Sequence, residues 1–304
     1  MKIELFGLPL PEVRPGDDLV RLLVESAAVC GGLQAGDVLV VTSKVISKAK
    51  GLVFSLAEVE PSRAAHRLAA RTGLDSRYIE LVLRNSEAIL CVVPLKAFWG
   101  EGIVDPAKLS DDEEAARRMI EAFPYEIFVL REGDVYSSAG VDTSNHPAGQ
   151  ASVPPPNADA AARELREKIR HLTGLDIPVV VSDTEYTLSV GTQDVARGCS
   201  GCKPVAGKFG RRDRFGKPKF GGADLVAHEL AAAAALLMGQ TDEGIPAVLV
   251  RGFRYTPADE GMTAYRFASD KAARAFQLII THSVRVLGLW WLLRFLRRLI
   301  LPGR

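Results

Sequence analysis

Apolar residues gather in short runs along this chain, and amphipathic stretches separate the runs. Several runs are apolar at consecutive positions and rich in β-branched residues, which is typical of strands that are buried on both faces. The strand candidates are a short segment near the N-terminus, Val38–Val41, Ile89–Val93, Ile177–Thr184 and Ala247–Val250, with a hairpin from Tyr125–Leu130 through Gly133-Asp134 to Val135 onward.

Helices are predicted where apolar residues recur at helical spacing after a capping residue. They are expected from Asp17-Asp18 onward, from Ser62 to Ala70, from Ser76 to Asn85, from Ala158 to Thr173, and from Ala223 to Met238 with Gly239 in the left-handed position that follows a helix. Strands interspersed with helices predict a mixed α+β fold. The charged segment 96–124 interrupts the pattern and is expected as a surface excursion with one helix.

The extended, proline-rich segment Pro147–Pro156 predicts a sub-domain boundary. We therefore expect an N-terminal α/β sub-domain over residues 1–150 that carries nucleotide-binding loops. A C-terminal α/β sub-domain over 151–280 would complete the site, and an apolar, basic helix would follow over 281–304.

Polar residues that suit phosphates or metals follow several of the predicted strands. Hydroxyls and lysines fill Thr42–Gly51, which would be either a phosphate site or a solvated basic turn. Asp142 and Asn145 supply a carboxylate and an amide in a loop of small residues, where an Asx-rich turn is the plainer interpretation. Asp183 follows an apolar strand, and a carboxylate buried there needs a cation or N–H partners.

The loop from Met238 to Ile245 connects the alanine-rich helix to the last strand. It offers an amide, a hydroxyl and two carboxylates, which are oxygen ligands suited to Mg²⁺ or Mn²⁺. Taken alone, a solvated turn is the simpler interpretation. Together with Asp142 and Asp183, however, Gln240 favours one shared metal site.

Residues 191–222 form a glycine-rich basic stretch, in which Lys208, Arg211 and Arg212 are candidates for an anionic substrate. A solvated loop is equally compatible with this composition. The pair Cys199 and Cys202 has a CxxC spacing, but a zinc site would need two further ligands, so a redox pair is the alternative. No histidine pair has metal-ligand spacing.

Composition narrows the classes of function. The 304 residues are 47% hydrophobic and 25% charged, and 38 Lys and Arg against 37 Asp and Glu give a net charge of +1. Such a balance argues against a nucleic-acid partner. The N-terminus lacks the apolar core of a secretion signal, so the cytoplasm is the expected location, and four cysteines do not form a disulfide scaffold.

The tail from Val284 to Leu301 is apolar and carries Arg294, Arg297 and Arg298 at helical spacing. It is shorter than the ~20 apolar residues that a spanning helix needs. Peripheral contact with a membrane surface and burial against a partner chain remain open alternatives.

The stretches Leu8-Pro9-Leu10, Ser43–Lys48, Ala139–Asn145, Ser182-Asp183-Thr184 and Met238–Gln240 through Arg251-Gly252 occur in the order seen in one family. In them the chain resembles the coenzyme F-420 gamma-glutamyl ligases, over about residues 4 to 275. Those enzymes add L-glutamate to a deazaflavin coenzyme precursor with GTP. The resemblance implies a mixed α/β ligase fold, an intertwined homodimer, and amide ligation through an acyl phosphate without a protein nucleophile.

The resemblance also implies site residues. Asp142, Asp183, Thr184 and Gln240 would hold two divalent ions, Mg²⁺ or Mn²⁺, with K⁺ as a further candidate. The nucleotide would contact the residues Leu8, Pro9, Leu10, Ser43, Lys44, Lys48, Asn145, Met238, Gly239, Gln240, Thr241, Asp242, Glu243, Gly244 and Ile245.

One departure from the family concerns the segment after Asp183-Thr184. The family usually carries a Gly-Arg pair and a further Arg there, whereas this chain has Glu185, Tyr186 and Thr187, then Leu188-Ser189-Val190. Because those arginines lie beside the Asp-Thr pair in the family, their absence here would affect binding of the acceptor or handling of phosphate. A related nucleotide-dependent amide ligase with another acceptor, or a non-catalytic nucleotide-binding relative, is therefore the alternative to the gamma-glutamyl ligase.

Overall fold

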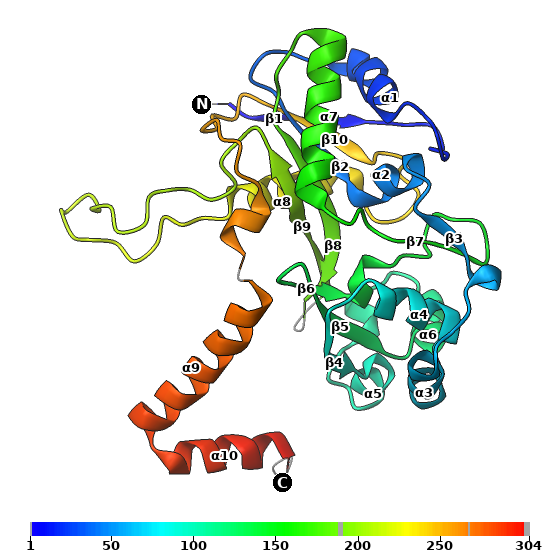
Figure 1. Ribbon diagram of the computed structural model, residues 1–304, viewed down its shortest axis with the longest axis vertical. Helices are drawn as coiled ribbons and strands as arrows, with labels where there is room; N and C mark the ends of the chain where they lie inside the picture. Colours follow the sequence, from blue (N-terminus) through cyan, green and yellow to red (C-terminus); the bar gives the residue numbers. More distant parts are fainter. Residues whose placement is uncertain (1, 188–190, 267, 301–304) are drawn as a thin grey trace. The chain divides into compact units, whose positions relative to one another are not determined.

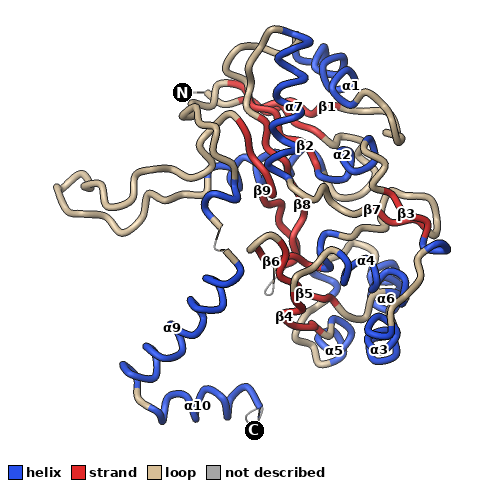
Figure 2. Tube along the Cα trace, viewed as in Figure 1, coloured by secondary structure: helices blue, strands red, loops and turns tan. Residues whose placement is uncertain are grey.

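The computed structural model describes residues 2–187, 191–266 and 268–300 (Figures 1 and 2). These residues form two compact units. The larger unit comprises Met1–Arg131 with Val135–Tyr265, and the smaller comprises Glu132–Asp134 with Arg266–Arg304. The expected mixture of helices and strands is confirmed, and the segment Leu188-Ser189-Val190 lies outside the described residues.

A five-stranded mixed sheet forms the centre of the larger unit. Its strand order is β1 (Glu4–Leu8), β10 (Ala247–Arg251), β2 (Val38–Thr42), β8 (Val179–Tyr186) and β9 (Thr192–Ser200). Only β2 and β8 run parallel, with Leu39 opposite Val179 and Thr42 opposite Ser182. The sheet therefore takes strands from both predicted sub-domains, whose division at residue 150 stays a prediction.

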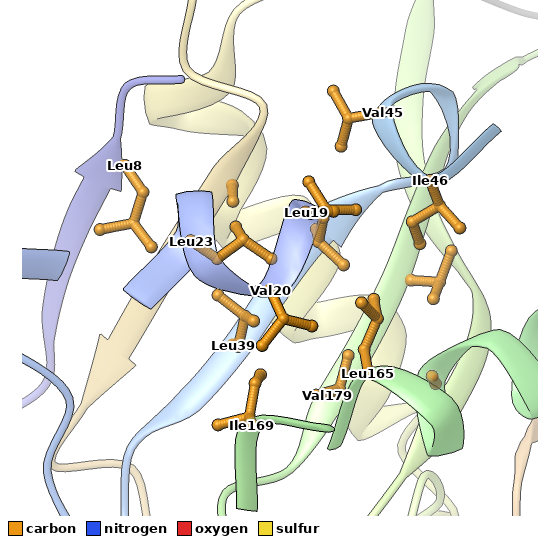
Figure 3. Close-up of a cluster of buried hydrophobic side chains, with 14 of the residues drawn as sticks. Leu8, Leu19, Val20, Leu23, Leu39, Val45, Ile46, Leu165, Ile169 and Val179 are labelled. Atoms are coloured by element: carbon orange, nitrogen blue, oxygen red, sulfur yellow. The ribbon is translucent and has the colours of Figure 1, made fainter. Parts of the chain in front are cut away.

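Both faces of this sheet are covered, as the continuous apolar runs predict. Leu39 and Val41 of β2 pack in one core with α1 (Leu19–Ser26), α2 (Ser43–Ala49) and α7 (Ala158–Thr173), as Figure 3 shows. Val38 and Val40 point the other way, into a core with α8 (Val226–Met238). Side chains alternate between faces along a strand, so one run of valine and leucine fills two cores.

A smaller sheet, with strand order β4 (Ala88–Val93), β5 (Glu126–Arg131) and β6 (Asp134–Ser137), lies below the central sheet in Figure 1. A third core connects it to the helices α3 (Arg63–Thr72) and α4 (Ser76–Arg84). Ser62 and Asp75 cap these two helices, and Gly73 ends the first in the left-handed conformation.

Several segments differ from their predicted structure. The basic turn after β2 is the helix α2, which begins directly at Ser43. The predicted linker contains a strand, β7 (Gln150–Ser152), which pairs with β3 (Val53–Ser55). The start of the predicted basic loop is β9, whose glycines and charges hid its strand character.

Two further predictions are corrected in detail. Segment 96–124 holds α6 (Glu113–Ala122) and most of α5 (Leu95–Gly100), so it contains two helices rather than one. Gly239 has φ 63° but ψ −168°, which is outside the left-handed helical region. This combination of positive φ and extended ψ is adopted almost only by glycine, so the backbone conformation requires Gly239.

The smaller unit consists mainly of α9 (Ser269–Leu287) and α10 (Leu289–Ile300), which meet at Gly288. The single predicted tail helix is thus two helices. Within residues 2–187, 191–266 and 268–300, no single helix is long and apolar enough to cross a membrane. The segments Gln277–Leu287 and Leu289–Arg297 meet the criterion only as a pair, and they are bent by 115°.

Asp159, in the first turn of α7, ties together three distant segments. Its carboxylate accepts hydrogen bonds from Cys199 N at 2.8 Å, Met262 N at 2.8 Å, Thr263 N at 2.9 Å and Thr263 Oγ1 at 2.6 Å. Gly261 permits this approach, since a β-carbon there would lie 2.2 Å from Asp159 Cγ. The side chain is buried, so water would not replace these bonds.

We expect Asp159→Ala to lower the free energy of unfolding by about 3 kcal/mol or more, because buried N–H donors lose a charged acceptor. The matched control is Asp18→Ala, which removes an exposed helix cap and should cost about 1 kcal/mol. Urea unfolding of both variants measures the difference. Equal losses would contradict the tethering role of Asp159.

Candidate functional site

A cavity of about 740 Å³ lies in the larger unit, where β2 and β8 end. Ligands gather at such strand ends in α/β sheets because the loops leaving neighbouring strands converge there. We call it the central cavity. Its lining comes from six parts of the larger unit: Leu10 to Val13; Thr42, Lys44, Val45 and Lys48; Tyr78, Leu95, Met119, Ile120, Phe123 and Glu126; Ser137, Ser138 and Gly140 to Asn145; Asp183, Thr184, Tyr186, Thr192 and Asp194; and Met238 to Pro246.

The segment Ser138–Asn145 forms one wall in a strained conformation. Ser138, Ala139 and Asn145 have φ values of 43°, 56° and 55°, which side-chain-bearing residues rarely adopt. The buried Arg131 supports the strained turn by donating to Ala139 O at 2.9 Å. At Gly140, a β-carbon would lie 2.7 Å from Pro154 Cγ and 3.2 Å from Asp183 Oδ2. This wall therefore lies directly against the Asp183 carboxylate.

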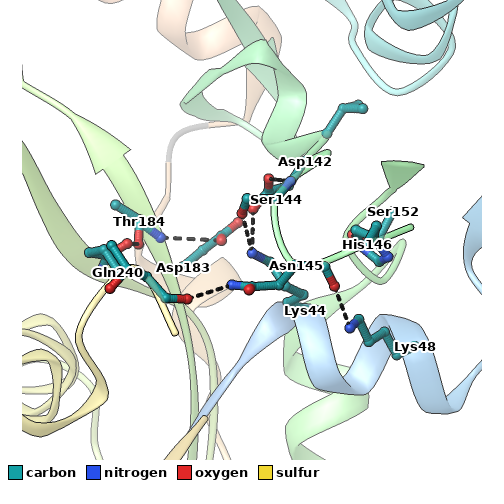
Figure 4. A network of polar contacts seen from close by, with 12 residues as sticks. Lys44, Lys48, Asp142, Ser144, Asn145, His146, Ser152, Asp183, Thr184 and Gln240 are labelled. Atoms are coloured by element: carbon teal, nitrogen blue, oxygen red, sulfur yellow. Dashed lines mark hydrogen bonds and ion pairs between the residues drawn. The ribbon is translucent and has the colours of Figure 1, made fainter. Parts of the chain in front are cut away.

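Two lysines one turn apart on α2 face this wall (Figure 4). Lys44 Nζ lies 2.7 Å from Asp142 Oδ2 and 2.7 Å from Ser144 Oγ. Lys48 Nζ donates to Asn145 O at 2.6 Å and to Glu12 Oε1 at 2.6 Å. Because α2 starts immediately after β2, both ammonium groups are placed at the cavity by the central sheet.

A second polar cluster joins β8, β9 and the end of α8. Thr184 Oγ1 lies 2.8 Å from Asp194 Oδ1 and 2.8 Å from Gln240 Oε1, and Gln240 Nε2 donates to Asp194 Oδ1 at 3.0 Å. Asp194 was not predicted as a site residue. It is opposite Thr184 in the β8–β9 register, so recognition of β9 as a strand would have found it.

Carboxylates dominate the cavity. Among the described lining residues, Lys44 and Lys48 are the cations, against seven acids: Glu12, Glu126, Asp142, Asp183, Asp194, Asp242 and Glu243. Burial raises the pKa of Asp183 to about 6, the charges of Asp142 and Glu185 add to this, and Arg197 and a hydrogen bond from Ser43 oppose it. Burial also raises the pKa of Asp194 against hydrogen bonds from Thr184 and Gln240.

Asp142 behaves differently. Burial acts to raise its pKa, but the neighbouring Lys44 and Ser144 overcome this effect and the pKa is lowered. Ionised Asp142 and half-buried Asp183 thus share the cavity at neutral pH, with too few cations beside them.

The donor set suits a hard divalent cation. Asp142, Asp183, Thr184 and Gln240 all line the central cavity and present oxygens, the ligands that Mg²⁺ and Mn²⁺ prefer. The described part of the chain holds no cluster of three or more His, Cys, Asp or Glu side chains that could bind a metal. Any metal here would therefore rely on the hydroxyl, the amide and non-protein ligands besides the two carboxylates.

Most predicted nucleotide residues also line the cavity: Leu10, Lys44, Lys48, Asn145 and every residue from Met238 to Ile245. Leu8 and Ser43 do not. Leu8 is fully buried in the core of Figure 3, and Ser43 is a buried partner of Asp183. Pro9 is exposed outside the lining, and its carbonyl accepts a hydrogen bond from Ser26 Oγ at 2.8 Å.

The predicted substrate residues Lys208, Arg211 and Arg212 are absent from the described cavity lining and lie in the long exposed loop between β9 and α8 (Figure 1). Within one chain they are therefore placed apart from the cavity. The predicted CxxC pair has its two sulfurs 3.5 Å apart, with both thiols free and buried.

Glu185 does not face the cavity as an isolated negative charge. Its carboxylate pairs with Arg197 of β9, whose guanidinium lies 3.5 Å from the centre of the Tyr136 ring, and it accepts a hydrogen bond from Ser137 N at 2.7 Å. An anionic acceptor would therefore meet a neutralised ion pair at this position and not a free carboxylate. Tyr186 lines the cavity instead. Tyr78, Phe123 and Glu126 also line it, although the sequence had indicated none of these three as site residues.

The opposite pKa shifts of Asp183 and Asp142 predict opposite effects on stability. The raised pKa of Asp183 means that its stabilising contribution is complete below about pH 4 and is lost as the pH rises through about 6. In chelator-treated protein without nucleotide, Asp183→Asn should thus be more stable than the wild type at pH 7–8, by roughly 3 kcal/mol, and equal to it near pH 4.

Asp142→Asn provides the matched control. Its lowered pKa stabilises the fold at neutral pH, and this contribution is lost as the pH falls through the folded-state pKa, so the variant should be less stable at pH 7 and approach the wild type in acid. Urea unfolding across this pH range measures both. If both substitutions destabilised the protein at neutral pH, the charged form of Asp183 would not be disfavoured in the folded state.

Comparison with known proteins agrees with the order of the motifs. Residues 7–252 match the family model described as F420-0:Gamma-glutamyl ligase. The chain is 39% identical over 271 residues to the coenzyme F420:L-glutamate ligase of Methanopyrus kandleri, which covers 88% of this chain and 92% of the relative. It is 34% identical to the same-named protein of Archaeoglobus fulgidus, over 90% of this chain and 97% of that one.

The family match covers every residue that lines the central cavity, from Leu10 to Pro246. The chain belongs to the F420-0:gamma-glutamyl ligase family.

Proposed function

We propose that this chain is a GTP-dependent ligase that joins L-glutamate to a coenzyme F-420 precursor through an amide bond. The observation that carries the proposal is the pair Asp142 and Asp183 in a carboxylate-rich cavity, facing the lysines of α2. Such a cavity would repel a nucleotide unless cations accompany it. The names of the relatives and the family support glutamate and the deazaflavin precursor as substrates.

Asp142, Asp183, Thr184 and Gln240 would hold two divalent ions, Mg²⁺ or Mn²⁺, with K⁺ as a further candidate. When bound, such ions neutralise phosphate charge and polarise the transferred phosphoryl group. The four residues fit this role because they present oxygen ligands and because the Asp183 carboxylate is only partly compensated by other groups.

The reaction that we propose has two steps. A precursor carboxylate attacks the γ-phosphorus of GTP, which gives an acyl phosphate and GDP. The amine of glutamate, after losing a proton, attacks the acyl carbon and releases phosphate. Lys44 and Lys48 would orient the phosphates, and Asn145, which donates to Thr241 O at 2.9 Å, would hold the nucleotide loop 238–245 against the Asp142 wall.

Activity should depend on both carboxylates. With GTP, Mn²⁺, glutamate and the precursor, Asp142→Asn and Asp183→Asn should each lower kcat by about a hundredfold to a thousandfold, as loss of transition-state charge stabilisation does. Product mass and phosphate release are the measurements. Asp111→Asn, an exposed acid on segment 96–124, is the control and should retain wild-type rates.

Since Asp183→Asn is expected to fold more stably than the wild type, its inactivity would not reflect unfolding. A fully active Asp183→Asn variant would refute the proposed role. Release of phosphate from GTP without product formation would favour a related ligase with another acceptor, and no reaction of the wild type with GTP would favour a non-catalytic relative.

A second proposal concerns the acceptor: the residue at position 186 influences how tightly the anionic precursor binds. No arginine lines the described part of the central cavity. Tyr186 lies in the segment after Asp183-Thr184, where the family usually carries arginines. Tyr186→Arg should therefore lower the KM for the anionic precursor about tenfold, the effect of one charge-assisted hydrogen bond. The KM for GTP should not change.

Tyr186→Phe is the matched control, because it keeps the ring that packs 6.2 Å from the Phe128 ring and adds no charge. Steady-state kinetics with each substrate varied in turn measures both variants. Equal KM values for the precursor in Tyr186→Arg and Tyr186→Phe would show that the charge at this position does not select the acceptor.

The homodimer implied by the family is also a proposal. A partner chain would be the natural source of cations near the cavity, since Lys208, Arg211 and Arg212 lie apart from it within one chain. Sedimentation velocity of the full chain tests this state directly.

A further inference from the structure

The C-terminal tail, which we define as the chain from Lys271 onward, has a one-sided charge. From Lys271 to Arg304 the sequence contains seven lysines and arginines and no aspartate or glutamate. The whole chain, by contrast, has a net charge of +1. The positive charge is therefore concentrated in the last tenth of the protein, and the remainder carries a compensating negative excess.

The helix α10 separates apolar and basic side chains. Leu289, Leu292, Leu293 and Leu296 recur at the spacing of one helical face, while Trp290, Arg294 and Arg297 share the other. Leu289 is 61% exposed and Trp290 is 75% exposed. Leucines beside exposed tryptophan and arginine are typical of a helix that lies in a membrane interface.

The preceding helix α9 also exposes apolar and basic side chains. Ile279, Ile280 and Leu287 are exposed on it, and Arg285 lies in its last turn. Such a series of exposed apolar side chains exceeds what an isolated protein surface normally carries. The match to the ligase family ends at residue 252, so the tail lies outside the part that builds the central cavity.

We propose that the C-terminal tail binds the surface of an anionic lipid bilayer. The leucine face of α10 would enter the boundary between headgroups and acyl chains, and Arg294 and Arg297 would pair with lipid phosphates. The positive charge of the tail favours an anionic bilayer over the tail of a second copy of the chain. Two tails would bring like charges together without one acidic residue to offset them, whereas an anionic surface complements every charged group.

The test is co-sedimentation of the full chain with vesicles of phosphatidylcholine containing about one third phosphatidylglycerol, a strongly anionic surface. We expect recovery with these vesicles, little recovery with pure phosphatidylcholine, and release as ionic strength rises. Arg294→Gln with Arg297→Gln should bind about tenfold to thirtyfold more weakly, because each cation near the surface contributes independently.

Two variants control this measurement. Arg67→Gln with Arg71→Gln removes two exposed helical arginines from α3 and should bind as the wild type does. Arg294→Lys with Arg297→Lys keeps the charge and should also bind. Absence of wild-type binding, equal binding to neutral vesicles, or equal loss in the α3 control would overturn the proposal. So would tail-dependent self-association in sedimentation velocity without vesicle binding, which would identify a second copy as the occupant.

Discussion

The parallel pairing of β2 with β8 is the contact on which the site depends. It sets Thr42 beside Ser182, so the two chain segments that follow, Ser43 with α2 and Asp183-Thr184, leave the sheet at the same edge. Apolar side chains on both faces of these strands fix the register, because a slip of one residue would exchange the two cores. Lysines and carboxylates far apart in the sequence are thereby held within hydrogen-bonding range.

That arrangement has an energetic cost. Burial and neighbouring acids disfavour the charge on Asp183, and the adjacent wall holds Ser138, Ala139 and Asn145 in strained conformations. Well-paired buried groups elsewhere in the larger unit offset these costs. Examples are Arg131, which donates to the strained turn, and Asp159 at the start of α7. A preorganised polar site of this kind gives up stability at the place where a ligand restores it.

Sequence patterns were informative where one local signal dominated. The runs Val38–Val41 and Ala247–Val250 and the capped helices α3, α4 and α7 lie close to their predicted bounds, because apolar periodicity and capping act within a few residues. The helix after β2 and the strand β9 were missed. Their hydroxyls, glycines and charged residues make tertiary contacts, and this composition resembles that of a loop. Asp194 was lost with β9, since only the hairpin register brings it to Thr184.

Cavity-lining residues from α4, from the segment directly after α6 and from β5 were not indicated as site residues by any sequence pattern. Tyr78, Phe123 and Glu126 have ordinary helical or strand contexts, and their convergence depends on how the third core packs. Leu8 shows the reverse case, since this motif position has its side chain buried in the core, and its predicted contact with the nucleotide stays a prediction.

The pairing of Glu185 with Arg197 has a consequence for how this chain can change. Both groups are largely buried, with 16% and 3% of their side chains exposed, so replacing either one alone strands the charge of the other. An arginine introduced at position 185 would meet Arg197 across the hairpin, and an apolar residue at 197 would leave Glu185 without its cation. The effects of substitutions at the two positions on stability are therefore non-additive, so the residue at one position limits which residues the other can accept.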